Sequence, residues 1–154
     1  MPKIVSLESA LAKSYRYEIA QLYFGNIQMC SHLDHYTFGD AYEKVGQFIE
    51  HLEADTCVGF AAFDGDELCG FVWAYPHQFR EEQRMYVSEI RVREDYRGKG
   101  IGRQLLEKVE ERARELGIGA LYLHAEADNP DAIKFYESLG FQAERVQLRK
   151  DVEP

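Results

Sequence analysis

Long hydrophobic runs are missing from this chain of 154 residues. The longest apolar stretches, residues 57–63 and 69–75, are far shorter than the roughly 20 residues that a membrane-spanning helix needs. The first residues show no long apolar core followed by small residues, so they predict no secretory signal. These absences favour a soluble protein of the cytoplasm that has no membrane partner.

Cysteine is scarce as well. The chain has Cys30, Cys57 and Cys69, an odd number without C-x-x-C spacing, which predicts reduced thiols and no disulfide framework. The stretch 30–35 also holds two histidines three positions apart and an aspartate. No second cluster completes a site there, and zinc needs three or four ligands, so the sequence predicts no metal site.

The chain also lacks an excess of positive charge. It has 27 acidic and 18 basic side chains, and residues 1–85 carry 13 acidic and 6 basic ones, a net charge of −7. A nucleic-acid-binding surface needs a basic stripe, so no nucleic-acid partner is predicted. The acidic first half has two open interpretations: it attracts a cationic amine, or it only keeps the protein soluble.

Two common nucleotide-binding motifs are absent. Gly98, Gly100 and Gly102 have G-x-G-x-G spacing, which is neither the Rossmann pattern G-x-G-x-x-G nor a P-loop. Instead, a β-prone stretch ends at Val92, and this glycine turn leads into an amphipathic helix. Glycines let the backbone approach a phosphate closely, and the N–H groups of a helix start carry partial positive charge. The turn therefore predicts a site for a phosphorylated cofactor. Three cations add to its charge: Arg97, Lys99 and Arg103.

Two blocks of sequence carry a resemblance to a known family. The run Arg97-x-x-Gly100-x-Gly102 after that strand resembles the acetyl-CoA-binding motif of the GCN5-related N-acetyltransferases, the GNAT superfamily. Residues 129–141 resemble the later motif of this family, N-x-x-A-x-x-F-Y-x-x-x-G-F. Both blocks stand in the family's order, and they span residues 89–141. The proline that commonly follows the strand in this family is replaced here by Glu94.

The resemblance implies an α/β GNAT fold, with a mixed, mainly antiparallel central sheet of six to seven strands flanked by about four helices, in the order β-α-α-β-β-β-α-β-α-β. Length and hydrophobic content predict a single domain over residues 1–154. Periodicity and turn residues place strands at 4–7, 56–63, 68–75, 86–92, 121–125 and 141–148, and helices at 8–28, 40–52, about 101–115 and 129–139. The turn residues at 64–67 predict that the second and third strands form an antiparallel hairpin. Alternation further predicts that Tyr86, Ser88, Ile90 and Val92 share one face of their strand.

The resemblance also implies acetyl-CoA as the co-substrate and assigns functional residues. Tyr136 matches the family's tyrosine near the CoA sulfur and is the candidate proton donor to the leaving thiolate. Glu89 is the candidate base that orders water toward the amine. Asn129, before Pro130, is a candidate cofactor contact and a helix cap. The remaining cofactor-binding candidates are Ile90 and Val92, through their backbone groups, and Arg91, Arg97, Gly98, Lys99, Gly100, Ile101, Gly102 and Arg103.

Each assignment has a plainer alternative. The glycine turn can be a charged turn without a ligand, Glu89 a paired carboxylate on a sheet face, and Tyr136 a packing aromatic. Trp73, Tyr75 and His77 alternate along one strand face, where they either line an acceptor cleft or pack in the core.

These residues predict an acetyl-CoA-dependent N-acetyltransferase that moves an acetyl group to a primary amine of a small cationic metabolite or drug by direct transfer in a ternary complex. Two alternatives stay open: a protein or peptide N-acetyltransferase, and a non-catalytic acyl-CoA-binding module. Because this family acts on many amines with one fold, the motifs do not identify the acceptor. A homodimer through residues 141–148 is a further open possibility.

Overall fold

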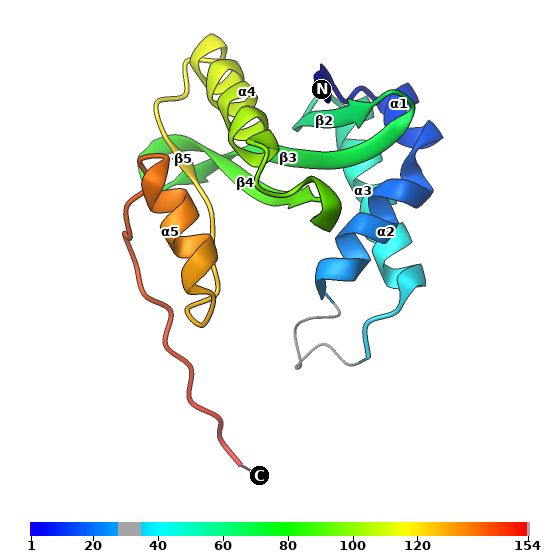
Figure 1. Ribbon diagram of the computed structural model, residues 1–154. Helices are drawn as coiled ribbons and strands as arrows, with labels where there is room; N and C mark the ends of the chain where they lie inside the picture. The colour runs from blue at the N-terminus through cyan, green and yellow to red at the C-terminus, as the bar shows by residue number, and fades with distance from the viewer. Residues whose placement is uncertain (28–34, 154) are drawn as a thin grey trace. The chain divides into compact units, whose positions relative to one another are not determined.

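The computed structural model describes residues 1–27 and 35–153, and the chain forms two compact units, residues 1–123 and 124–154 (Figure 1). No helix in the described ranges is long and apolar enough to cross a membrane. The elements of the first unit are β1 (Lys3–Ser6), α1 (Ser9–Ser14), α2 (Arg16–Ile27), α3 (Phe38–Glu53), β2 (Val58–Asp64), β3 (Glu67–Phe79), β4 (Glu82–Val92), the 3₁₀ turn η2 (Glu94–Tyr96), α4 (Ile101–Glu115) and β5 (Leu121–Tyr122). The second unit contains α5 (Pro130–Ser138).

The first unit is built on a sheet with the strand order β1-β2-β3-β4-β5. Strands β1 to β4 pair antiparallel in succession. The fifth strand, β5, runs parallel to β4 and pairs with it only at Met85 and Tyr86. The predicted turn at residues 64–67 joins β2 to β3, with Gly65 in a left-handed conformation. The predicted six to seven strands are therefore wrong for the described residues, which form five strands together with five α-helices.

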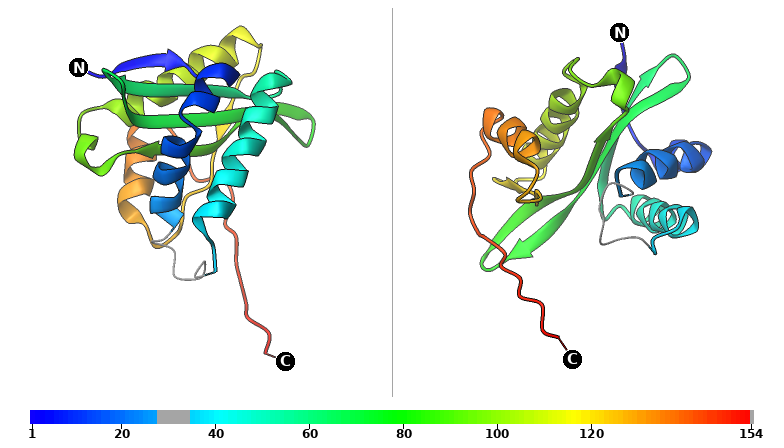
Figure 2. Two further views of the ribbon diagram at one scale, coloured as in Figure 1. Left: turned by 90° about the vertical axis from the view of Figure 1, so that its right-hand side faces the viewer. Right: turned by 60° about the horizontal axis from the view of Figure 1, so that its bottom comes forward.

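Helices cover both faces of this sheet (Figure 2). On one face lie α1, α2 and α3, and Phe48 of α3 stacks on Trp73 of β3 with ring centroids 4.4 Å apart. The other face carries α4, which crosses β3 at Gly70. A Cβ at Gly70 would lie 3.4 Å from side-chain atoms of both Ile101 and Leu105. The missing side chain thus lets the start of α4 pack closely on the sheet.

Strand β4 contains a β-bulge at Ser88. Trp73 of β3 pairs with Glu89, but the next residue, Ala74, pairs with Val87. Ser88 is therefore an extra residue on β4, and such a residue shifts the alternation of side chains along its strand.

The bulge makes the predicted common face of Tyr86, Ser88, Ile90 and Val92 wrong. Tyr86 pairs with Tyr75, and the two rings meet edge to face with centroids 5.4 Å apart. Because Tyr75 packs against the core under α1–α3, Tyr86 lies on that face, opposite to Ile90 and Val92. A bulge has no strong sequence signal, so alternation alone did not reveal it.

The helix predicted at residues 8–28 is interrupted, and α1 and α2 meet at Tyr15. The Tyr15 hydroxyl donates to the Asp66 carbonyl oxygen at 3.0 Å, and its ring contacts Phe63 with centroids 4.8 Å apart. These contacts hold Tyr15 to the β2–β3 hairpin. Because these contacts are long-range, the helical periodicity of the sequence did not predict the break at Tyr15.

In the second unit, α5 begins after Asn129 and is followed by Gly140, whose φ of 96° is left-handed. The predicted strand at 141–148 is wrong, because residues 141–153 form no strand. Its alternating polar and apolar residues fit a strand, but a strand also needs a neighbour for its N–H and C=O groups. The strand predicted at 121–125 is likewise shorter and ends at Tyr122.

Candidate functional site

The glycine loop, residues 97–103, depends on the backbone freedom of two glycines. Gly98 has a φ of 78° and Gly100 a φ of 82°, both in the left-handed region. No atom lies within 4 Å of a Cβ built at either position, so a side chain would not clash there. Glycine is favoured at both positions because of the left-handed backbone conformation. Gly100 is the N-cap residue of α4.

The start of α4 presents backbone donors. The amide of Gln104 donates to the carbonyl of Gly100 at 3.1 Å, so the three preceding amides have no acceptor within the helix. No side chain caps this end, and the first turn contains no acidic residue. Within the described residues, the positive end of this 15-residue helix thus has neither a capping side chain nor an acidic residue in its first turn, an arrangement that suits phosphate groups.

Polar contacts tie the segment before the loop to the β2–β3 hairpin. The Tyr96 hydroxyl donates to Asp64 Oδ2 at 2.6 Å, and this hydrogen bond to a carboxylate raises the pKa of Tyr96 to about 12. Arg93 binds Asp95 at 2.7 Å and reaches Glu67 at 3.6 Å. The turn that leads into the glycine loop therefore has a fixed anchor.

The three predicted cations all lie at this loop. Arg97 Nε donates to the carbonyl of Val92 at 3.2 Å, which joins the loop to the end of β4. Lys99 Nζ lies 5.0 Å from the centroid of the Tyr96 ring. Arg103 forms an ion pair with Glu107 one helical turn further along, at 3.3 Å.

The edge of β4 next to the loop is open. Because β5 pairs with β4 only at Met85 and Tyr86, residues 87–92 have no strand partner on that edge within the described part of the chain. Ile90 and Val92, the predicted backbone contacts, lie in this open segment. It leads directly into η2 and the glycine loop.

Glu89 and Arg91 form an ion pair on the opposite side of the strand from Ile90. Arg91 Nη2 lies 2.7 Å from Glu89 Oε2, and the two side chains are 25% and 17% exposed. Arg91 Nη1 donates to the carbonyl of Ile90 at 3.0 Å. Arg91 Nε is buried and has no hydrogen-bond partner among the described residues.

Three more polar side chains interact electrostatically with Glu89 from the face of the sheet that α1–α3 cover. Lys44 of α3 stabilises the charged carboxylate, and the Glu89 charge in turn opposes ionisation of Tyr23 and Tyr36. Tyr23 and Tyr36 are hydrogen-bonded to each other. We call these five residues, Glu89, Arg91, Lys44, Tyr23 and Tyr36, the Glu89 cluster.

Burial decides the protonation behaviour of Glu89. Burial removes water from this carboxyl and raises its pKa, while the positive charges of Arg91 and, to a smaller extent, Lys44 lower it. The net result is a pKa above the ordinary value for glutamate, which brings the group closer to neutral pH. Burial is also the main cause of the raised pKa of Tyr23.

Sequence reasoning missed most of this cluster. It named Arg91 only as a cofactor-binding candidate, although residues two apart on a strand share a face and Arg91 can therefore pair with Glu89. The contribution of Lys44 comes from a distant helix and has no local signal. Of the aromatic candidates, Trp73 is a core residue, 3% exposed. His77 is exposed and hydrogen-bonded to Tyr122.

The other predicted site residues lie in the second unit. Asn129 Oδ1 accepts a hydrogen bond from the amide of Ala132 at 3.2 Å, which confirms the predicted helix cap. Tyr136 of α5 is half-buried, and its ring contacts Phe141 edge to face with centroids 5.7 Å apart. Glu89, the end of β4 and the glycine loop thus belong to the first unit, and Asn129 and Tyr136 belong to the second.

The metal-like stretch at residues 30–35 lies outside the described residues except for His35, which is exposed. Among the residues that the structure does describe, no three His, Cys, Asp or Glu side chains form a group that could hold a metal ion.

Comparison with known proteins identifies the family. Residues 17–141 match the Acetyltransferase (GNAT) family. The chain belongs to this family. An uncharacterized N-acetyltransferase of Bacillus subtilis, YdgE, is 32% identical over 89 residues, which cover 58% of this chain and 57% of that protein. A second one from the same organism, YycN, is 34% identical over 54% of each chain. The chain thus spans little more than half the length of these relatives.

Solved structures show the same fold. A putative acetyl transferase from Pyrococcus furiosus is similar over 99% of this chain and 100% of its own length, with a TM-score of 0.79 and 29% identity. An aminoglycoside N-acetyltransferase in complex with CoA, AAC(6')-Iy, is similar over 98% of this chain and 95% of its own, with a TM-score of 0.75 and 20% identity. The second likeness concerns the fold alone.

Proposed function

We propose that this protein transfers an acetyl group from acetyl-CoA to a primary amine by direct transfer in a ternary complex. The observation that carries the proposal is the uncapped positive end of α4, reached through a loop of left-handed glycines at the end of an open strand edge. Family membership supports it. The neighbour with bound CoA shares this fold.

The residues present fit a CoA group. The amides of residues 101–103 and the side chains of Arg97, Lys99 and Arg103 would hold the pyrophosphate, because these donors and cations surround one helix end. The open edge of β4 offers backbone N–H and C=O groups to an extended, amide-bearing arm. When bound, acetyl-CoA supplies the thioester carbonyl that the amine attacks.

Glu89 is the proposed base. An alkylamine is protonated at neutral pH and must lose a proton before it can attack a carbonyl carbon. A carboxylate whose pKa is raised by burial is a better proton acceptor near neutral pH than an exposed one. Glu89 would accept this proton through an ordered water, while Arg91 fixes the orientation of the carboxylate at 2.7 Å.

Tyr136 is the proposed proton donor to the leaving sulfur. A phenol is neutral at pH 7 and can donate its proton to a thiolate. The residue matches the family motif at residues 129–141. Its function is tested by Tyr136→Phe, for which we expect a fall in kcat with little change in the KM for acetyl-CoA. Phe135→Leu, which changes the exposed neighbour of Tyr136, is the control.

Part of the acidity of the first half lies on the outer side of α3. Glu43, Glu50 and Glu53 of α3, with Lys13 and Arg16, line a surface pocket of about 420 Å³. Glu43 and Glu50 lie on the side of α3 away from its buried residues, so they do not face the sheet. We propose a small-molecule amine as the acceptor.

The first experiment measures free thiol released from acetyl-CoA over a panel of polyamines, aminoglycosides, amino acids and basic peptides. The thiols of Cys57 and Cys69 are buried and their pKa values are raised, so these two contribute little background, and a blank without acetyl-CoA corrects for all three cysteines of the chain. Release that depends on one small amine class supports the proposal. Release with peptides alone supports protein acetylation. CoA binding without release from any amine supports a binding module and contradicts the proposal.

A further inference from the structure

The charges that act on Glu89 are both positive. Arg91 and Lys44 are cations that favour the charged form of this carboxylate. Tyr23 and Tyr36 are neutral, because burial raises their pKa values and the Glu89 charge raises them further. Asp40, one turn before Lys44 on α3, acts on Tyr36, so two cations face the carboxylate of the proposed base itself.

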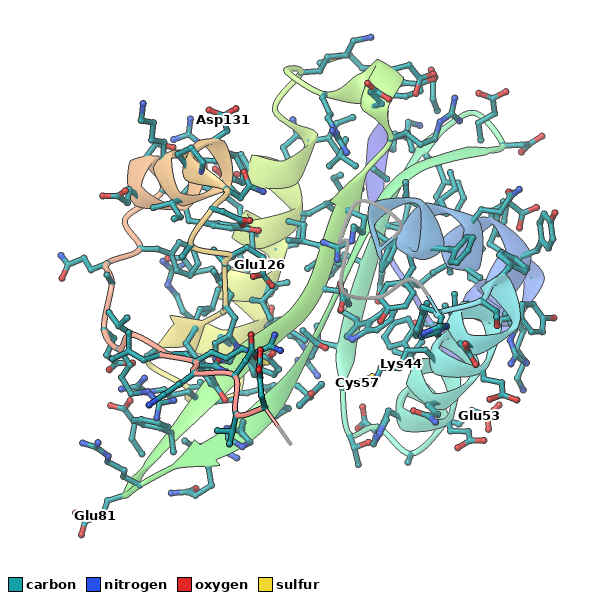
Figure 3. All side chains as sticks on the ribbon, turned by 90° about the horizontal axis from the view of Figure 1, so that it is seen from below. Lys44, Glu53, Cys57, Glu81, Glu126 and Asp131 are labelled. Carbon is teal, nitrogen blue, oxygen red and sulfur yellow. The ribbon has the colours of Figure 1, made fainter. Side chains whose placement is uncertain are left out.

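Packing explains how Lys44 comes to this position. On α3, Lys44 stands one turn before Phe48, and residues four apart share a side of a helix. Phe48 stacks on Trp73 at 4.4 Å, and Trp73 is the cross-strand partner of Glu89. Figure 3 labels Lys44 between α3 and the strands, whereas Glu53 lies at the outer side of the helix. Lys44 thus borders the buried face of α3.

The donors of Arg91 are only partly used. Its guanidinium has five N–H groups, of which one is paired with Glu89 and one with the Ile90 carbonyl. Arg91 Nε has no partner among the described residues. A guanidinium is a suitable partner for a carboxylate because its planar fork matches the two oxygens.

We propose that Lys44 and Arg91 bind a carboxylate of the acceptor next to Glu89, so that the acceptor is an amine with an acidic group, as in an amino acid, and not a pure polycation. The inference rests on the proposed acetyl transfer. Both cations would attract a carboxylate, while a polyamine would bring further positive charge beside them. The acceptor's amino group would lie on the Glu89 side and its acidic group on the Lys44 side.

The test compares amines that differ only in a carboxylate: lysine with cadaverine, and ornithine with putrescine. Thiol release at saturating acetyl-CoA gives kcat/KM for each. We expect the amino acid of each pair to be the better acceptor by about tenfold, the size of one charge-assisted contact. Equal values within a pair, or a better diamine, would overturn the carboxylate site while leaving acetyl transfer intact.

Variants of Lys44 separate binding from catalysis. Lys44 is exposed, so Lys44→Met is expected to fold, and at pH 8 it should raise the KM for lysine about tenfold with little change in kcat. It should not raise the KM for cadaverine, because loss of a cation reduces the repulsion of a diamine. The conservative variant Lys44→Arg should keep the KM for lysine close to that of the unchanged protein. Lys108→Met, on the exposed side of α4, is the matched control.

A third readout does not depend on turnover. Calorimetric titration of lysine into the CoA-loaded protein should show saturable binding that is weakened in Lys44→Met. If no amine of either series is acetylated, the proposed acetyl transfer fails, and absence of lysine binding then overturns the carboxylate site as well. A loss in Lys44→Met that is equal for lysine and cadaverine also overturns it.

Discussion

The glycine loop and the Glu89 cluster lie at the same strand, β4, but they are built differently. The loop consists of consecutive residues, and its chemistry comes from backbone amides and two left-handed glycines. The cluster draws its side chains from α2, α3, β4 and the segment before α3. A site for an invariant phosphate group can be local, whereas a site for a variable acceptor depends on the packing of several elements.

The largest effect on kcat is expected from a substitution in the Glu89 cluster that leaves the glycine loop intact. Glu89→Gln should lower kcat by about hundredfold, because a positioned base contributes on the order of 10²–10⁴. The KM for acetyl-CoA should stay the same. Steady-state thiol release checks both constants, with Glu111→Gln on the exposed face of α4 as the control. A raised KM for acetyl-CoA with an unchanged kcat would contradict the assignment of Glu89.

A smaller effect is expected from a substitution in the glycine loop that leaves the Glu89 cluster intact. Gly100→Ala should weaken CoA binding by about tenfold, since an alanine in the left-handed region costs roughly 1–2 kcal/mol. Gly119→Ala is the matched control, because Gly119 is exposed, has no positive φ and has no atom near its Cβ position. Calorimetric titration of CoA compares the two variants. Equal affinities would show that the loop does not hold the cofactor.

A weaker perturbation acts on the anchor of the loop. Tyr96→Phe removes the hydrogen bond to Asp64 and should raise the KM for acetyl-CoA roughly threefold, with kcat unchanged, since exposed polar contacts contribute little. Tyr17→Phe, at an exposed tyrosine on α2, serves as the control. If kcat falls and the KM does not change, the anchor acts on chemistry and not on cofactor binding.

The pH dependence gives the smallest shift and sharpens the difference between the two regions. Glu89 must be deprotonated to act as the base, and its pKa is raised, so the acidic limb of kcat/KM should lie above the ordinary range of a glutamate. Loss of Lys44 removes a cation that favours the carboxylate, so Lys44→Met should move this limb to higher pH. Gly100→Ala should leave it in place. A limb that does not move in Lys44→Met would contradict the electrostatic effect of Lys44 on Glu89.

The sequence predicted the parts of the site that depend on consecutive residues. The glycine pattern of residues 98–102 and the Asn129-Pro130 cap follow from backbone preferences that hold in any context. The break at Tyr15 depends on a contact with a distant hairpin. For the same reason no pattern placed Lys44 near Glu89, because their proximity results from α3 packing on β3.

The fold was predicted in its order of elements more than in their lengths. Helices α3 and α4 were located by their apolar positions to within a few residues, and the hairpin turn at Gly65 by its turn residues. Residues 141–148 show the limit, because alternation describes how a strand would look but not whether a neighbouring strand is present.

The extra residue at Ser88 divides β4 into two halves that alternate separately. Residues 82–87 pair regularly with β3 as far as the turn at residues 80–81. In the other half, Glu89 and Arg91 lie on the face of the sheet that α1–α3 cover. A one-residue deletion here would restore the ladder and exchange the faces of one half relative to the other. Substitutions in residues 82–87 can therefore leave the orientation of Glu89, the proposed base, unchanged, because the bulge separates the alternation of the two halves.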